Sequence, residues 1–228
     1  LLLLTKKPST SISGGSSRKN QKSNSIIITF YSLIAMVSTY GIFSGIETVN
    51  LVQANLSYVG TRINATPLKK HNFILAGVIV SLLLNLFANA ILIFFIKFVL
   101  KIELFNEIKY STIFIILGNL FGVAFGILVG VSNNQSSNVK TIIGIIITLF
   151  LSFLSGMMGP WMKAMIDKNI PILNRINPIS IITNNLYRIN LLENVKSVKE
   201  GIAILSIYCI VLILISYGFL RRRSYDSI

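Results

Sequence analysis

Charged residues are scarce in this sequence, and acidic residues are the scarcest of them. Only 12% of the 228 residues are Asp, Glu, Lys or Arg, and only seven are acidic, whereas 53% are hydrophobic. A soluble globular domain carries about 25% charged residues, because its surface must be hydrated. The composition therefore excludes an ordinary soluble protein.

Several residue types that carry catalysis or bind metals are almost missing. One cysteine, Cys209, and one histidine, His71, leave no disulfide framework and no pair of cysteine or histidine metal ligands. The chain also lacks a Gly-Lys dipeptide, which every GxxxxGK[ST] phosphate-binding loop contains, so it is not itself a P-loop ATPase. We predict a non-enzymatic protein with no catalytic residue, no cofactor and no metal.

Long hydrophobic runs, by contrast, make up nearly half of the chain. Five stretches contain no Asp, Glu, Lys, Arg or His: Ile26–Ile46, Phe73–Ile96, Thr112–Val131, Thr141–Met158 and Ile202–Leu220. With a rise of about 1.5 Å per residue, each is about as long as the ~30 Å hydrocarbon core of a bilayer is thick. The sequence therefore predicts an all-α, polytopic bundle with five transmembrane helices in residues 26–228.

The absence of ionisable side chains from these spans disfavours two functions. Proton- or sodium-coupled carriers and intramembrane hydrolases usually depend on such groups within the membrane. The net charge of +14 comes from Lys and Arg residues between the spans. That placement is typical of anchors at the membrane surface, so we predict no nucleic-acid partner.

The segments near the first two spans differ in character. Residues 1–25 are rich in Ser, Gly and Lys, which indicates a flexible polar tail or the remnant of an extracellular segment, and the missing initiator Met indicates a fragment or a processed chain. After the first span, apolar residues recur at helical spacing, at Val49, Val52, Leu56 and Val59. They predict that the first span continues as an amphipathic helix. The segment Lys97–Ser111 fits either a short interfacial helix or the frayed end of the second span.

The segment between Gly159 and Gly201 is too apolar for an ordinary loop. Pro171 and Pro178 prevent one continuous helix, and each apolar piece is too short to cross a bilayer. We predict short helices that dip partly into one leaflet, with breaks at Pro171, Asn177 and Pro178.

Small residues recur every four positions in the third and fourth spans. They are Gly118, Gly122, Gly126 and Gly130 in the third span, and Gly144, Thr148, Ser152 and Gly156 in the fourth. Such ridges let helix backbones approach closely, so they predict tight packing, either between these two spans or against neighbouring helices. In the second span, Asn85 and Asn89 fit either a polar path or hydrogen bonds to a neighbouring helix.

Two parts of the chain resemble the permeases of bacterial type-two ABC transporters. The run Gly60–Leu68 (GTRINATPL), followed by Phe73–Gly77 (FILAG), is similar to the loop between the second and third helices of that family, and Glu47 falls where the family has an acidic residue. The run Ser155–Pro160 (SGMMGP) is similar to the start of the hairpin before the family's last helix. Later residues of that hairpin match at Pro171, Asn177-Pro178-Ile179 and Tyr187.

The resemblance implies a membrane-spanning permease subunit of an ATP-driven (ABC) exporter in the cell (cytoplasmic) membrane. The implied partners are separate ABC ATPase subunits, a second permease copy or paralogue in a homo- or heterodimer, and membrane lipid. Residues that would transmit force from the ATPases are Glu47, Gly60, Arg62, Thr66 and Pro67. Because such permeases usually have six helices, the resemblance also implies an N-terminally truncated chain that lacks the first one.

The charge distribution and the resemblance disagree about orientation. The side that holds the tail, Lys97–Ser111 and Gly159–Gly201 carries 14 of the 21 Lys and Arg residues. The positive-inside rule would place this side in the cytoplasm, whereas the resemblance places it outside. We follow the resemblance, because the missing first helix would normally set the orientation.

Two other functions compete with transport. A non-transporting membrane scaffold or immunity-type protein is equally compatible with the lack of buried ionisable groups. An intramembrane enzyme would need polar catalytic groups at one depth, where only Ser, Thr, Asn and Tyr are available. An adjacent ATPase reading frame would favour a transporter over a scaffold.

Overall fold

The computed structural model describes residues 13–53, 56–65, 70–133, 135–192 and 198–223. Within these ranges the chain forms ten helices and no strand. The helices are α1 (Ser13–Thr39), α2 (Gly41–Val52), α3 (Tyr58–Asn64), α4 (Lys70–Phe98), α5 (Ile108–Ser132), α6 (Ser137–Ser155), α7 (Pro160–Asn169), α8 (Pro171–Ile176), α9 (Pro178–Leu191) and α10 (Val198–Arg223). The predicted all-α fold is confirmed.

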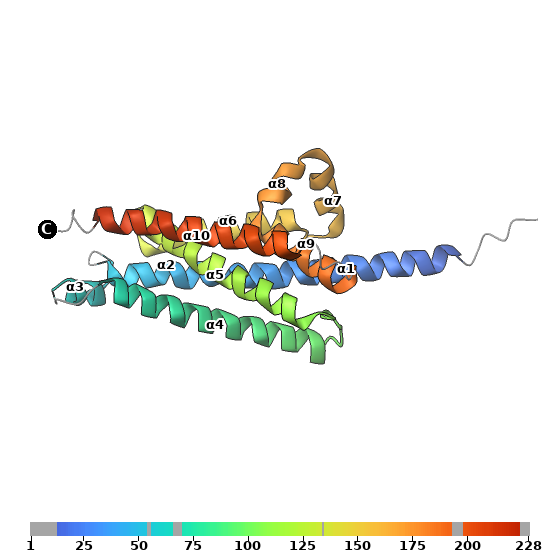
Figure 1. Ribbon diagram of the computed structural model, residues 1–228, viewed down its shortest axis with the longest axis horizontal. Coiled ribbons are helices and arrows are strands. Elements are labelled where there is room, and N and C mark those ends of the chain that lie inside the picture. Colours follow the sequence, from blue (N-terminus) through green and yellow to red (C-terminus); the bar gives the residue numbers. More distant parts are fainter. Residues whose placement is uncertain (1–12, 54–55, 66–69, 134, 193–197, 224–228) are drawn as a thin grey trace, which may run out of the picture.

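Five helical stretches are long and apolar enough to cross a membrane, as the sequence predicts. They are Ile26–Val52, which combines most of α1 with α2, Asn72–Phe98 in α4, Ile108–Ser132 in α5, Ser137–Ser155 in α6 and Val198–Leu220 in α10. Successive spans run in opposite directions, so the connections gather at two ends of the bundle (Figure 1). One end holds α3 and the end of α10, and the other holds α7 and α8. We call them the α3 end and the α7–α8 end.

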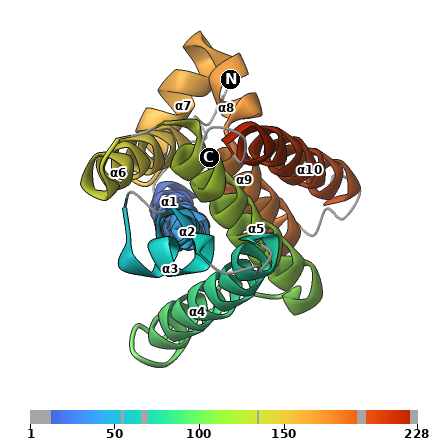
Figure 2. The same ribbon diagram turned by 90° about the vertical axis from the view of Figure 1, so that its left-hand side faces the viewer.

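Helix α5 occupies the centre of the bundle and contacts α1, α2, α4, α6, α9 and α10 (Figure 2). In its most apolar window 67% of the residues are buried, against 17% in α10 and 22% in α4. The main hydrophobic core lies where α1, α5 and α9 meet, and Ile34, Phe114 and Ile182 are completely buried there. Helices α4 and α10 therefore present most of their apolar side chains to lipid.

The predicted amphipathic continuation of the first span is wrong beyond Val52. The helix ends there, and Gln53 adopts an extended conformation. A separate helix, α3, then begins with Ser57 as its N-cap, whose Oγ accepts a hydrogen bond of 2.8 Å from the backbone N–H of Gly60. Val49 of α2 is buried, but Val59 of α3, which continues the spacing, is 50% exposed, so the pattern does not mark one continuous buried face.

Neither interpretation of Lys97–Ser111 describes the whole segment. Helix α4 extends to Phe98 and α5 begins at Ile108, but the chain between them is not helical. Asn190 of α9 holds this connection, because its Oδ1 accepts hydrogen bonds from the backbone N–H groups of Asn106 and Glu107 at 2.9 and 3.0 Å. Side-chain capping from another helix thus replaces the hydrogen bonds that a helix would have made locally.

The segment before the last span forms short helices, as predicted. Helices α7, α8 and α9 each start with a proline, at Pro160, Pro171 and Pro178. The side chain of Asn177 caps α9 by accepting a hydrogen bond of 2.9 Å from the backbone N–H of Ile179. Proline lacks an N–H and suits the first helical position, so each one starts a new helix.

The fourth span ends before its predicted limit at Met158. Helix α6 stops at Ser155 because Gly156 adopts a left-handed conformation with φ of 107°. Glycine takes this conformation without the steric cost that a Cβ atom would add. The chain therefore turns toward α7 at the end of the small-residue ridge.

Candidate functional site

The glycine ridge of α5 lies against the backbones of α1 and α2. A Cβ atom added at Gly122 would lie 2.6 Å from the carbonyl oxygen of Thr39, and one added at Gly126 would overlap the carbonyl oxygen of Ile42. Gly45 of α2 faces the ridge in return, and its added Cβ would lie 3.0 Å from the Cα atom of Gly126. The ridge partner is therefore chiefly the first span rather than α6.

The ends of the α5 ridge and the ridge of α6 meet side chains instead. An added Cβ at Gly118 would lie 2.8 Å from the Cδ1 atom of Ile182, and one at Gly130 would lie 2.8 Å from the Cβ atom of Val49. On α6, Gly144 faces Ile46, and Ser152 is completely buried. The two ridges thus bring α5 and α6 against the same first span.

Asn85 and Asn89 belong to a buried polar cluster that joins three spans. Asn85 donates to the carbonyl oxygen of Ser38 at 2.9 Å, and the Ser38 hydroxyl donates to Asn89 Oδ1 at 3.1 Å. Asn89 also donates to Asn119 Oδ1 of α5 at 3.4 Å. These hydrogen bonds between α1, α4 and α5 favour helix packing over a polar path.

Lys140 does not act as an anchor at the membrane surface, because its side chain is completely buried at the α3 end. Its Nζ donates hydrogen bonds to the carbonyl oxygen of Gly130 at 2.8 Å, to Gln53 Oε1 at 2.9 Å and to Asn50 Oδ1 at 3.4 Å. The ammonium group therefore ties together the ends of α2 and α5 and the start of α6. In the sequence, the Lys140 cluster is indicated only by two polar residues, Asn50 and Gln53, at the end of the apolar first span.

Helix α3 presents a set of exposed residues that we call the α3 surface: Tyr58, Val59, Thr61 and Arg62. The Tyr58 side chain is 92% exposed and Val59 is 50% exposed, whereas Ile63 on the opposite face is only 6% exposed. Exposed aromatic and arginine side chains are enriched where proteins bind other proteins. The α3 surface therefore has the composition of a docking site for a protein partner.

Two of the other residues predicted to transmit force, Glu47 and Gly60, lie on α2 and α3. Glu47 is exposed on α2, one to two turns before that helix ends. Gly60 is buried within α3, and its backbone N–H makes the N-cap hydrogen bond to Ser57. Thr66 and Pro67 lie outside the described residues. The structure thus places Glu47, Gly60 and Arg62 at one end of the bundle.

The described residues have few side chains of the kinds that bind metals. They contain no group of three or more His, Cys, Asp or Glu side chains that is able to hold a metal ion. Their buried polar side chains instead join helices, as the clusters around Asn89 and Lys140 do. These clusters hold the helices of the bundle together.

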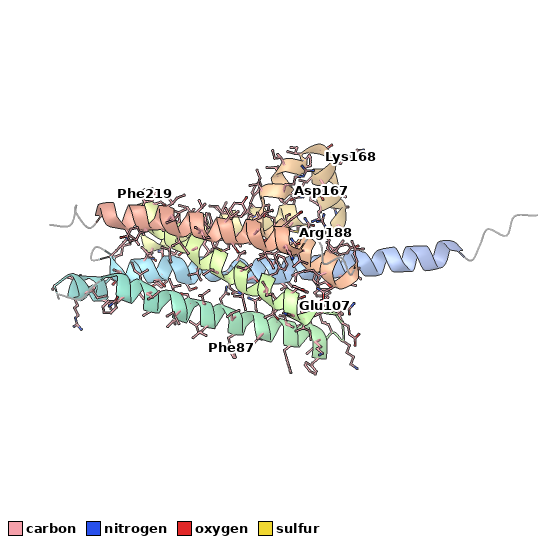
Figure 3. All side chains as sticks on the ribbon, in the orientation of Figure 1. Phe87, Glu107, Asp167, Lys168, Arg188 and Phe219 are labelled. Carbon is pink, nitrogen blue, oxygen red and sulfur yellow. The ribbon has the colours of Figure 1, made fainter. Side chains whose placement is uncertain are left out.

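A bundle of five apolar spans with lipid-exposed side chains such as Phe87 on α4 defines a multi-pass helical membrane protein (Figure 3). A family model described as "ABC-2 family transporter protein" matches residues 2–217. The chain therefore belongs to the ABC-2 transporter family and is a membrane permease of an ABC transporter. Comparison with the curated proteins and with the solved structures gives no match.

Proposed function

We propose that this chain is the membrane-spanning subunit of an ATP-driven exporter in the cytoplasmic membrane, powered by ABC ATPases on separate chains. The observation that carries the proposal is the α3 surface, where Tyr58, Val59 and Arg62 are exposed beyond the membrane-crossing helices. Family membership supports pairing with ABC ATPases in general. The α3 surface is the docking site that we assign to them.

Only α2 lies between α3 and the central helix α5, so a displacement of α3 is transmitted to the centre of the bundle through few contacts. Helix α3 packs on α2, and α2 lies against α5 through the contact of Gly45 with Gly126. Lys140 joins the ends of α2, α5 and α6 through hydrogen bonds. The close backbone contact and these hydrogen bonds couple α2 to α5. Movement of α3 would therefore move the first span and α5 together.

The proposed path for substrate lies between two permease subunits, which are two copies of this chain or this chain with a paralogue. The polar residues inside the bundle, such as Ser38, Asn85 and Asn89, hydrogen-bond one another. They fill the interior of the bundle, so the proposed path lies at an interface between two bundles. The surfaces of α4 and α10, with Leu83 and Leu214 more than 60% exposed, are available to lipid or to a second subunit.

The proposal requires the α3 end to face the cytoplasm, against the count of positive charges. We expect an impermeant thiol reagent to label Lys168→Cys in intact cells but not Gln135→Cys, both in a Cys209→Ser background. Both positions are exposed, and they lie at the α7–α8 end and the α3 end respectively. Labelling after membrane permeabilisation is the control that Gln135→Cys is reactive. Labelling of Gln135→Cys alone in intact cells would invert the orientation.

The direct test of the function is association with an ATPase. We expect the permease, co-expressed with an ABC ATPase from its own gene neighbourhood, to copurify with it and to raise its rate of ATP hydrolysis in lipid nanodiscs. An ATPase variant with its Walker A lysine changed to alanine should still copurify but should not hydrolyse ATP. Failure of every neighbouring ATPase to bind would contradict the proposal and favour a non-transporting membrane protein.

A further inference from the structure

A polar groove lies at the α7–α8 end, opposite the α3 surface. It has a volume of about 530 Å³ and is formed by α7, α8, α9 and the first turns of α10. Its charged and amide side chains are Asp167, Asn174, Arg175, Asn184, Asn185, Arg188 and Glu200. Figure 3 shows Asp167 and Arg188 at this end of the bundle, far from Phe219 at the other end. The volume is within the usual range of small-molecule sites, about 300–1,000 Å³.

The side chains that line the groove include two cations and two anions, and Lys163 adds a third cation beside them. Arg175, Arg188, Asp167 and Glu200 are all exposed and so accessible to a ligand. Burial lowers the pKa of the neighbouring Lys163, while the Asp167 carboxylate raises it and the Arg188 guanidinium lowers it. Lys163 lies beside the groove, because its Nζ donates a hydrogen bond to Asn184 Oδ1. A ligand that carries both signs of charge is the best electrostatic match.

The carboxylate of Asp167 is held in place by a chain of hydrogen bonds. Asn174 donates to Asp167 Oδ1 at 2.6 Å, and Ser180 donates to Asn174 Oδ1 at 2.8 Å. Asn174 and Ser180 are buried, so α7, α8 and α9 are locked together behind the groove. An acceptor fixed in this way binds a cation at a lower entropic cost than a freely moving side chain does.

Asn185 supplies an acceptor that still needs a donor. Its side chain is 6% exposed, and its Nδ2 donates to the carbonyl oxygen of Ile181 at 2.8 Å. Among the described residues no donor reaches its Oδ1 atom. Asn185 packs directly on Gly201, where an added Cβ would lie 2.7 Å from the Asn185 Cγ atom. A buried acceptor without a donor is costly, and a small rotation of the Asn185 side chain toward the groove would let an ammonium group satisfy it.

The groove opens onto an apolar surface of the membrane boundary. Glu200 and Gly201 lie in the first turn of the α10 span, and Ile204 continues the lining one turn further. Beyond it, Ile207 of α10 is 59% exposed, and Ile172 of α8 is 60% exposed. A ligand with a charged head and apolar tails would place the head in the groove and the tails along α10. This arrangement favours a lipid over a soluble molecule or a peptide.

We propose that this groove binds a phospholipid with a zwitterionic head that contains a primary ammonium group, such as phosphatidylethanolamine. The phosphate pairs with Arg175 and Arg188, and the ammonium pairs with Asp167, Glu200 and the Oδ1 atom of Asn185. The two carboxylates disfavour an anionic lipid, whose head offers them no cation. The site is independent of the proposed transport and of the ATPase.

The test measures lipid retention by the full chain purified in detergent. Native mass spectrometry with added dioleoylphosphatidylethanolamine should show a bound lipid, and dioleoylphosphatidylglycerol should bind about tenfold more weakly. Arg188→Gln and Glu200→Gln should each reduce binding of the first lipid about five- to tenfold, because each removes one charge-assisted contact. Lys168→Gln and Lys199→Gln, at exposed neighbouring positions that do not line the groove, should bind it as the unchanged protein does.

A third arm separates a lipid from a soluble ligand with the same head. Free O-phosphoethanolamine at the same concentration should neither compete with the lipid nor raise the temperature of unfolding. If it competes as well as the lipid itself does, the site is for a soluble zwitterion and the lipid assignment is overturned. Equal binding of the two phospholipids, or equal binding by the groove variants and the lysine variants, would overturn the site itself.

Discussion

Gly126→Ala should destabilise the protein by several kcal/mol, the largest effect expected of any single methyl group in this chain. The added Cβ atom would overlap the carbonyl oxygen of Ile42 in the backbone of α2. Backbone atoms cannot rotate out of the way as a side chain can, so the two spans must separate. Overpacking typically costs about 1–3 kcal/mol and more where the backbone has to move. Gly126→Leu should prevent the spans from packing at all.

The matched control for this prediction is Gly218→Ala. Gly218 is also a glycine within a membrane-crossing helix, but an added Cβ there would meet no atom within 4 Å. Alanine favours a helix over glycine by about 1 kcal/mol, so this variant should be at least as stable as the unchanged protein. Thermal unfolding in detergent and the yield in membranes measure both variants. Equal unfolding temperatures for the two would show that α2 and α5 do not touch at Gly126.

The number and position of the spans could be predicted from the sequence because one physical requirement dominates them. A helix must cross about 30 Å of hydrocarbon without charge, and few other structures use 18 or more such residues in a row. The prolines at Pro171 and Pro178 were equally informative, because a proline ends the preceding helix whatever its surroundings. Both kinds of signal are local, and both gave the right helices.

The partner of the glycine ridge could not be predicted, because a four-residue spacing marks a face but not what covers it. The sequence left the partner open between the fourth span and a neighbouring helix, and Gly122 and Gly126 lie against the first span. The burial of Lys140 could not be predicted for a similar reason. Its position in a polar linker suggested a surface charge, and only the fold brings Gln53 and the carbonyl oxygen of Gly130 to it.

The helix break after Val52 could not be predicted from the sequence for a different reason. Apolar residues at Val49, Val52 and Val59 keep the spacing of one helix, although α2 and α3 are two. The N-cap Ser57 starts α3 on a new axis, and a serine between apolar residues is a weak signal on its own. The consequence for the candidate site is large, because a separate α3 can expose Tyr58 and Arg62 where a continued α2 would not.

Arg62→Glu in the complete permease should abolish copurification with its ATPase and leave insertion into the membrane unchanged. Arg62 is exposed on the α3 surface, next to the 92% exposed Tyr58. A charge change on a solvated face alters stability by only about 0.5 kcal/mol or less. Losing a charged or aromatic anchor at the centre of a protein interface typically costs about 2 kcal/mol or more, which weakens binding at least tenfold. Tyr58→Ala should have an effect of the same size.

Charge reversal at Glu47 tests how far the docking site extends. Glu47 is exposed on α2, so Glu47→Lys should also insert normally. If the ATPase contacts α2 as well as α3, this variant should retain less ATPase and a lower rate of ATP hydrolysis per complex. Normal association with normal hydrolysis would confine the docking site to the α3 surface and remove Glu47 from the coupling residues.

Lys109→Glu is the control that separates docking from a general effect of charge. Lys109 is exposed in the first turn of α5, at the opposite end of the bundle, and its reversal changes the net charge by the same amount as that of Arg62. It should copurify with the ATPase at the level of the unchanged permease. Copurification at that level by Arg62→Glu and Tyr58→Ala as well would exclude α3 as the docking site. Loss of ATPase by Lys109→Glu alone would instead place the ATPase at the α7–α8 end and reverse the proposed orientation.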